Sequence, residues 1–150
     1  VPDRVLVPCG GGGLTAGVAT AVKHHCPEAE IHTVEPMGFD DTARSLASQS
    51  RQSNPAGVNS FCDALLAPEP GQITFQVNQW LCSSGLVVSD EDVAVAMATA
   101  FGQLKLAVEP GGATALAAAL AGKLDLSKGN TVIVLSGGNV DPAQFAGILG

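Results

Sequence analysis

Four consecutive glycines, Gly10 to Gly13, follow a short run of branched apolar residues near the start of the chain. Such a run lets several backbone N–H groups point at one spot, because no side chain stands in the way. Helix-forming residues begin at Leu14, and the first turn of a helix adds unpaired N–H groups and a partial positive charge. A plain turn would need only one glycine, and each further one carries an entropic cost. The segment therefore predicts a site for a phosphate dianion.

The same segment also fits a second phosphate-binding pattern. Gly11, Gly13 and Ala16 match the G-x-G-x-x-A fingerprint of dinucleotide-binding folds. Glu35 lies 24 residues after Gly11 (35 − 11), where an acid at the end of the next strand holds a ribose hydroxyl in such folds. From this stretch alone, an NAD-binding Rossmann half-domain of an oxidoreductase is an open alternative.

Strand-like and helix-like segments alternate along the chain. The periodicity predicts strands at residues 4–8, 31–35, 86–88 and 131–135, and the last is apolar throughout, as in a strand buried on both faces. It predicts helices at residues 14–25, 41–47, 73–81, 90–104 and 113–121, and from residue 142 onward. This order indicates an α/β fold with an open, mostly parallel sheet and helices on both faces. No repeat or low-complexity linker divides residues 1–150, so a single domain is expected.

Three unusual groups of residues stand directly at or after predicted strands. They are Gly10 to Gly13, Glu35, and the turn Ser136-Gly137-Gly138. Ligands of open parallel sheets bind outside the carboxyl ends of the strands. The three groups are therefore expected to share one site.

The chain resembles the fold-type II family of pyridoxal-phosphate enzymes, in its threonine/serine dehydratase and serine racemase branch. The resemblance covers nearly the whole chain and rests on four segments whose order and spacing match the C-terminal half of such enzymes. These are Pro8-Cys9-Gly10-Gly11-Gly12-Gly13-Leu14, Glu35-Pro36, Glu109-Pro110-Gly111-Gly112-Ala113 and Ser136-Gly137-Gly138-Asn139-Val140-Asp141. The resemblance implies that the chain is the C-terminal part of the large, cofactor-binding domain of such an enzyme, and it favours pyridoxal phosphate over NAD.

The resemblance also assigns residues to pyridoxal 5'-phosphate. The cofactor phosphate would be held by the backbone amides of Gly10, Gly11, Gly12, Gly13 and Leu14. Ser136 would face the pyridine nitrogen, and Glu109 would lie near the ring. A neutral hydroxyl does not hold a proton on the ring nitrogen, so the ring is a weaker electron sink, which suits prompt loss of a β-hydroxyl group from the substrate.

The implied activity is that of an ammonia-lyase, which converts threonine or serine to a 2-oxo acid and ammonia. A serine racemase-type isomerase is the alternative within the family. The Schiff-base lysine of the family lies in an S-F-K-x-R-G segment, and none of the four lysines has that context: Lys23, Lys105, Lys123 and Lys128. No catalytic residue is therefore expected in this chain, which would be inactive alone and active within a full-length homo-oligomer. A truncated, non-catalytic interaction module is the third hypothesis.

One further departure and one further site follow from the resemblance. Ala64 stands where the family commonly has a glycine, and its methyl group would narrow the pocket floor. Glu35, the backbone carbonyl of Phe39 and Asp41 resemble a divalent-cation site of the racemase branch, and these oxygen ligands suit Mg²⁺ or Ca²⁺. The competing interpretation makes Glu35 a solvated strand end and Asp41 a helix cap.

Composition excludes several classes of partner. The chain has 14 acidic and 7 basic residues, a formal net charge of −7 and only 4% aromatic residues, so a nucleic-acid partner is not expected. The longest near-apolar run, residues 113–121, is too short to span a bilayer, so no membrane association is expected. The four cysteines form no C-x-x-C pair and suit a reducing compartment, so a cytoplasmic location is expected. The three histidines, His24, His25 and His32, have no ligand partner at suitable spacing and are expected on the surface.

The charged fraction also carries information. At 14% it lies well below the roughly 25% usual for a soluble domain. Part of the surface of this chain is therefore expected to be covered by something outside it.

Overall fold

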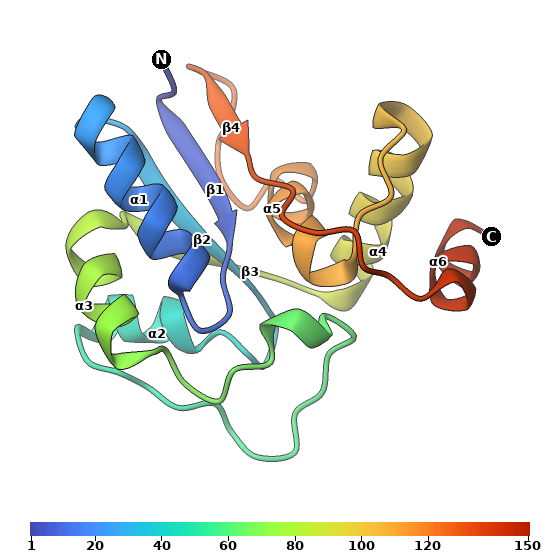
Figure 1. Ribbon diagram of the computed structural model, residues 1–150, viewed down its shortest axis with the longest axis horizontal. Helices are drawn as coiled ribbons and strands as arrows, with labels where there is room; N and C mark the ends of the chain where they lie inside the picture. The colour runs from blue at the N-terminus through green and yellow to red at the C-terminus, as the bar shows by residue number, and fades with distance from the viewer.

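A four-stranded parallel sheet organises the chain in the computed structural model, which describes residues 1–150 (Figure 1). Its strands are β1 (Arg4–Pro8), β2 (Glu30–Pro36), β3 (Ser84–Val88) and β4 (Thr131–Ile133). They lie in the order β3-β2-β1-β4, and each neighbouring pair is parallel. The carboxyl ends of all four strands therefore lie at the same edge of the sheet. The predicted open, parallel α/β architecture is confirmed.

Helices cover both faces of the sheet, as predicted. One face carries α1 (Gly13–His25), α2 (Asp41–Ser48) and α3 (Gln72–Leu81) (Figure 1). The other face carries α5 (Pro110–Leu120), with α4 (Asp90–Thr99) packed against α5 and α6 (Pro142–Leu149) against α4. A 3-10 turn, η1 (Asp63–Leu65), contacts the start of α5, and a π-helical turn, η2 (Ala100–Leu104), extends α4.

Side chains that alternate along β1 divide the interior into two cores. Leu6 belongs to the larger core, between the sheet and the α4–α5 layer, whereas Val5 and Val7 belong to a smaller core with Ala19 of α1. Most of α5 is buried, from Pro110 to Ala118, and its alanine side chains let the helix lie close to the sheet. Both faces of the middle strands are thus covered, and β2 also buries the polar side chains of His32, Thr33 and Glu35.

Side-chain caps mark the starts of two helices. Ser89 and Asp92 form a capping box at α4, in which the Asp92 N–H donates to Ser89 Oγ (3.1 Å) and the Ser89 N–H donates to Asp92 Oδ2 (3.0 Å). Asp141 caps α6 by accepting the Gln144 N–H (2.9 Å). The helix predicted through Leu104 changes at Ala100 into the π turn η2 and ends at Lys105, whose φ is +61°.

The burial predicted for the last strand is wrong. β4 has three residues, pairs only with β1 and lies at the edge of the sheet, so Val132 is 47% exposed. An apolar composition does not reveal how many strands flank a segment, and here no strand lies on the outer side of β4.

Candidate functional site

The glycine loop, defined as Gly10 to Gly13, joins β1 to α1 at the carboxyl edge of the sheet. The Cys9 N–H donates to the Val34 carbonyl (2.9 Å), but the N–H groups of Gly10, Gly11 and Gly12 donate to no protein atom. Gly12 is the N-cap of α1 and supplies no side-chain cap, so the N–H groups of the first helical turn are free as well. Consecutive unpaired donors at the start of a helix form a site for an anion.

Each glycine of the loop has a distinct structural setting. Gly12 has φ +89°, and a Cβ there would lie 2.9 Å from Asn78 Nδ2. A Cβ on Gly10 would lie 3.3 Å from the Ala64 carbonyl oxygen. Gly11 and Gly13 have no positive φ, and a Cβ on either would meet nothing within 4 Å. Neither backbone conformation nor packing explains these last two, so the open space above the loop fits a phosphate group.

The turn that carries Ser136 follows β4, the strand beside β1. Ser136 is exposed and its hydroxyl has no hydrogen-bond partner in the chain. Glu109 fixes this turn by two hydrogen bonds. Its N–H donates to the Gly137 carbonyl (3.0 Å), and its carboxylate oxygen Oε2 accepts the Asn139 N–H (3.0 Å). A Cβ on Gly137 would lie 2.5 Å from Glu109 Oε1, so a side chain there would displace the Glu109 carboxylate.

Close contacts connect the loop with the Ser136 turn. The turn η1 contributes Ala64, which lies against Gly10 on one side and against Gly111 at the start of α5 on the other. The next residue, Gly112, is so close to Gly137 that a Cβ would lie 2.8 Å from the Gly137 N and O atoms. The glycine loop, Ala64, Glu109 and the Ser136 turn thus form one continuous group at the carboxyl edge of the sheet. Leu14, in the first turn of α1, is 47% exposed beside the loop.

Glu35 is not a solvated strand end, so that expectation is wrong. Its side chain is fully buried, and its two oxygens accept the N–H groups of Thr42 (2.8 Å) and Ala43 (2.7 Å) at the start of α2. Neither aspartate caps α2 through its side chain. The N-cap Asp40 makes no capping hydrogen bond and instead pairs with Arg44 Nε (3.3 Å), and Asp41 is the first residue of the helix. Because Glu35 is enclosed in this way, it does not present its carboxylate to a ribose, as the dinucleotide alternative requires.

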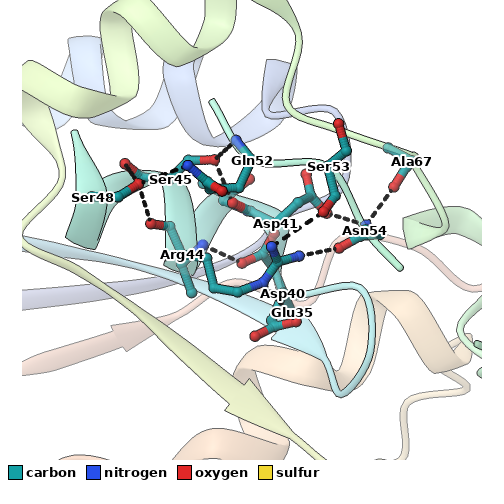
Figure 2. A network of polar contacts seen from close by, with 12 residues as sticks. Glu35, Asp40, Asp41, Arg44, Ser45, Ser48, Gln52, Ser53, Asn54 and Ala67 are labelled. Atoms are coloured by element: carbon teal, nitrogen blue, oxygen red, sulfur yellow. Dashed lines mark hydrogen bonds and ion pairs between the residues drawn. The ribbon is translucent and has the colours of Figure 1, made fainter. Parts of the chain in front are cut away.

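Asp41 lies beside Glu35 in a buried polar network (Figure 2). Its Oδ1 accepts the Asn54 amide (2.5 Å), whereas its Oδ2 is buried without a partner. Burial raises the pKa of Glu35 to about 8 against the effect of the Thr42 N–H, and the charge of Asp41 raises it further. Burial also raises the pKa of Asp41, which the Asn54 hydrogen bond lowers. Two enclosed carboxylates with a spare oxygen fit a hard divalent cation.

A third oxygen ligand would have to come from the backbone. No group of three or more His, Cys, Asp or Glu side chains is arranged to hold a metal ion. Phe39 lies in the turn between Glu35 and Asp41, where its N–H donates to the Pro36 carbonyl (3.0 Å). The structure thus puts the three predicted ligand residues in one short segment.

A polar cluster also lies toward the amino-terminal ends of the strands, away from the glycine loop. His24 and His25 are exposed as predicted, but His32 is only 4% exposed, so its expected surface position is wrong. It lies on the inner strand β2, its Nδ1 is 2.8 Å from Ser84 Oγ, and burial lowers its pKa. The largest cavity, about 430 Å³, is also here, lined by residues 1–4 and 25–30, and is remote from the glycine loop.

Sequence reasoning missed two residues of α3 that contact the loop. Thr74 and Asn78 donate hydrogen bonds to loop carbonyl groups. Asn78 is buried and lies three residues after the buried Phe75, on the inner stripe of α3. An amide on an apolar stripe needs a polar partner, and this was the signal available in the sequence.

All four cysteines are free. None of the helices has the length and hydropathy needed to cross a bilayer.

Comparison with known proteins now adds independent information. Residues 1–137 match the family described as "Pyridoxal-phosphate dependent enzyme". The chain is 40% identical over 149 residues to a phenylserine dehydratase of Ralstonia pickettii, covering 99% of this chain and 45% of that protein. It is 36% identical to a serine racemase of Dictyostelium discoideum, covering 98% of this chain and 46% of that protein. The chain thus spans less than half the length of these curated relatives.

Solved structures agree with the sequence matches. A threonine deaminase from T.th. superposes with a TM-score of 0.88 at 38% identity, over 94% of this chain and 50% of that one. Maize serine racemase superposes with a TM-score of 0.88 at 37% identity, over 97% of this chain and 45% of that one. These neighbours share the fold. The family match supports pyridoxal phosphate rather than NAD as the cofactor. The chain belongs to the family of pyridoxal-phosphate dependent enzymes.

Proposed function

We propose that this chain forms the cofactor-phosphate side of a pyridoxal-phosphate dependent ammonia-lyase that acts on threonine or serine. One observation carries the proposal: the N–H groups of Gly10, Gly11 and Gly12 have no acceptor, at the sheet edge that also carries Ser136. Unpaired amides at a helix start bind a phosphate dianion, and the neighbouring turn lies on the adjacent strand, within reach of the rest of the same molecule.

Each predicted residue receives a role in this proposal. The phosphate is bound by the backbone amides of Gly10, Gly11, Gly12, Gly13 and Leu14. Ser136, whose hydroxyl has no partner in the chain, binds the pyridine nitrogen. Glu109 acts on the cofactor indirectly, because its carboxylate and N–H fix the turn that presents Ser136. Ala64, between Gly10 and Gly111, forms the floor of the pocket and limits the size of the substrate.

The chemistry follows from these positions. Pyridoxal phosphate, when bound, withdraws electrons from the α-carbon of an amino acid. The neutral hydroxyl of Ser136 does not hold a proton on the ring nitrogen, which favours prompt loss of a β-hydroxyl group over slower reactions. The substrate loses water, and a second water releases ammonia and leaves a 2-oxo acid. None of the four lysines has the family's sequence context, so we assign no catalytic residue within residues 1–150 and place the activity in the full-length protein.

A serine racemase-type activity is the second candidate, and the acid pair favours it. Glu35, Asp41 and the Phe39 carbonyl would hold Mg²⁺ or Ca²⁺. A cation would neutralise the two buried carboxylates and give Asp41 Oδ2, which has no hydrogen-bond partner, a ligand. Serine racemases are also among the relatives at 36–40% identity.

The proposal is tested with the full-length protein. Calorimetric titration with pyridoxal 5'-phosphate and with pyridoxal, which lacks the phosphate, is expected to show much tighter binding of the phosphorylated form. Incubation of the loaded protein with L-threonine and L-serine is expected to release 2-oxo acid and ammonia, whereas formation of D-serine would favour the second candidate. Folded protein that binds both forms equally would overturn the proposal.

A non-catalytic interaction module is the remaining hypothesis. It is expected to self-associate in light scattering and to show no thermal shift with pyridoxal phosphate. We expect the full-length protein to be a homo-oligomer under both hypotheses, because apolar side chains such as Trp80 and Ile73 are 84% and 77% exposed on α3, so the thermal shift is the measurement that separates them.

A further inference from the structure

We propose that Thr74 and Asn78 of α3 are positioning residues that orient the peptide groups of the glycine loop, so that the loop N–H groups point outward to the bound phosphate. This inference rests on the proposed function, because it assigns a purpose to residues behind the phosphate site. Neither residue touches the cofactor in this proposal; each acts through a loop carbonyl.

The hydroxyl of Thr74 is the first of the two contacts. It donates to the Gly11 carbonyl oxygen at 2.6 Å, and the Gly71 N–H donates to the same oxygen at 3.1 Å. The hydroxyl oxygen of Thr74 is also 3.1 Å from the Gly71 carbonyl oxygen. A hydroxyl has one proton to donate, and the shorter distance favours the bond to the Gly11 carbonyl. Two donors from the start of α3 thus converge on one loop carbonyl.

The amide of Asn78 is the second contact. Its Nδ2 donates to the Gly12 carbonyl oxygen at 3.3 Å, alongside the Ala16 N–H at 2.9 Å. Asn78 is 1% exposed, and its Oδ1 has no partner. Burying an amide with an unpaired oxygen costs stability, and an apolar residue on this stripe of α3 would avoid that cost. The structure therefore carries a polar group whose sole hydrogen bond goes to the loop.

Peptide geometry turns these contacts into a direction for the N–H groups. No cis peptide bond is present, so the C=O and N–H of each peptide point in opposite directions. The peptide with the Gly11 carbonyl contains the Gly12 N–H, and the peptide with the Gly12 carbonyl contains the Gly13 N–H. Because α3 draws both carbonyls inward, both N–H groups point away from α3. A loop without these contacts would be free to rotate its peptides, since glycine restricts them least.

Packing between α3 and the loop is tight enough to hold this arrangement. A Cβ on Gly12 would lie 2.9 Å from Asn78 Nδ2 and 3.0 Å from Thr74 Oγ1. A Cβ on Gly71 would lie 2.7 Å from Thr74 Oγ1 and 3.1 Å from the Gly11 oxygen. Glycine therefore stands at both positions that Thr74 and Asn78 approach, Gly12 in the loop and Gly71 before α3. Open space remains only beside Gly11 and Gly13.

The test compares two ligands in the full-length protein. Thr74→Val removes the hydroxyl and keeps the shape, and Asn78→Leu removes the amide. Each is expected to weaken pyridoxal 5'-phosphate about 10-fold and to leave the affinity for pyridoxal unchanged, because only the phosphate contacts the loop. Thr74→Ser keeps the hydroxyl and is expected to bind like the parent. Thr99→Val is the matched control, since that hydroxyl contacts only the Val95 carbonyl on α4.

Phosphorus NMR gives a readout that a scaffold role would not move. The resonance of the bound phosphate is expected to shift in Thr74→Val and to stay in place in Thr99→Val. If Thr74→Val and Thr74→Ser bind both ligands as the parent does, or lose both equally, the inference is overturned and α3 serves only as scaffold. If the parent itself shows no preference for the phosphorylated ligand, the proposed function fails as well, so the two failures are distinguishable.

Discussion

The glycine loop and the Glu35–Asp41 pair lie at the ends of neighbouring strands, yet they leave opposite kinds of hydrogen-bonding group without a partner. The loop offers consecutive N–H groups that find no acceptor, whereas the pair buries two carboxylates and leaves Asp41 Oδ2 without a donor. Surplus donors favour an anion and surplus acceptors favour a cation. The sign of the unsatisfied polar groups therefore predicts the sign of the ligand at each place.

A buried contact joins the two places. Cys9, directly before the loop, donates through Sγ to Thr42 Oγ1 (3.6 Å), and the Thr42 N–H donates to Glu35. Burial raises the pKa of the Cys9 thiol to about 12, so this connection is neutral at ordinary pH. The two sites can therefore be altered separately without creating a new charge between them.

Gly12→Ala is expected to have the largest effect, because it disrupts the glycine loop, which supplies the unpaired N–H donors. A methyl group there meets Asn78 and Thr74 at a φ of +89°, so the loop must move. We expect at least a ~100-fold loss of pyridoxal phosphate affinity and a loss of about 1–2 kcal/mol in unfolding free energy. Calorimetry and urea denaturation of the full-length protein measure the two. Parent-like affinity would show that the loop does not bind the phosphate.

Titration of Glu35, in the pair of buried carboxylates, is expected to give the next largest effect, on the unfolding free energy. Its pKa in the folded protein is about 8 against an ordinary 4.5, so its contribution to stability is complete below about pH 4.5 and is lost as the pH rises to 8. Without divalent cations, the unfolding free energy is expected to fall by about 2–3 kcal/mol between pH 5 and 8.

Urea denaturation at several pH values measures this slope. Glu35→Gln is expected to flatten it, and Ca²⁺ is expected to oppose it at pH 8 by favouring the ionised pair. Glu28→Gln, at an exposed position after α1, serves as the control and keeps the slope. A parent protein whose stability is constant over this range would contradict the assignment of a buried, protonated acid.

Gly11→Ala sharpens the comparison, because it separates ligand binding from stability. Its methyl group would enter open space at an unstrained φ, so the free protein is expected to keep its unfolding free energy. Pyridoxal phosphate affinity is expected to fall about 10-fold, since the methyl group occupies the phosphate space. Gly17→Ala, also without neighbours and on an exposed turn of α1, is the control and is expected to bind normally.

Asn54→Ala is expected to have the smallest effect. It removes the donor to Asp41 Oδ1 and a second bond to the Ala67 carbonyl (2.8 Å), as Figure 2 shows. The unfolding free energy is expected to fall by about 1 kcal/mol, and the pKa of Asp41 is expected to rise. Asn59→Ala, on an exposed loop, controls for loss of an amide. If Ca²⁺ affinity and stability are both unchanged, the network around Asp41 does not support a cation.

Local signals in the sequence were sufficient for much of the fold. The boundaries of β1, α1 and α6 lie within a residue or two of the prediction, because glycine, proline and capping residues act on their own neighbours. The burial of β4 and of His32 could not be predicted, because it depends on which strands lie on either side, and single-strand composition does not specify neighbours.

The same distinction applies to the candidate sites. The glycine loop is contiguous, so its donors were visible as a run of residues. The burial of Glu35 could not be predicted, because its partners are the amides of α2, which reach it only after the turn through Gly38, where φ is +87°. Thr74 and Asn78 are more than sixty residues from the loop carbonyls that they bind, and no spacing rule connects them.

The outer side of β4 has a practical consequence for handling the protein. Thr131, Val132 and Ile133 carry no charge, and no proline or bulge interrupts them, so their unpaired backbone groups form a template for another strand. Copies of this chain that meet there can extend the sheet from one molecule to the next, as in early aggregates. Concentrated samples of residues 1–150 alone should therefore precipitate through this edge, and Val132→Lys should keep them in solution.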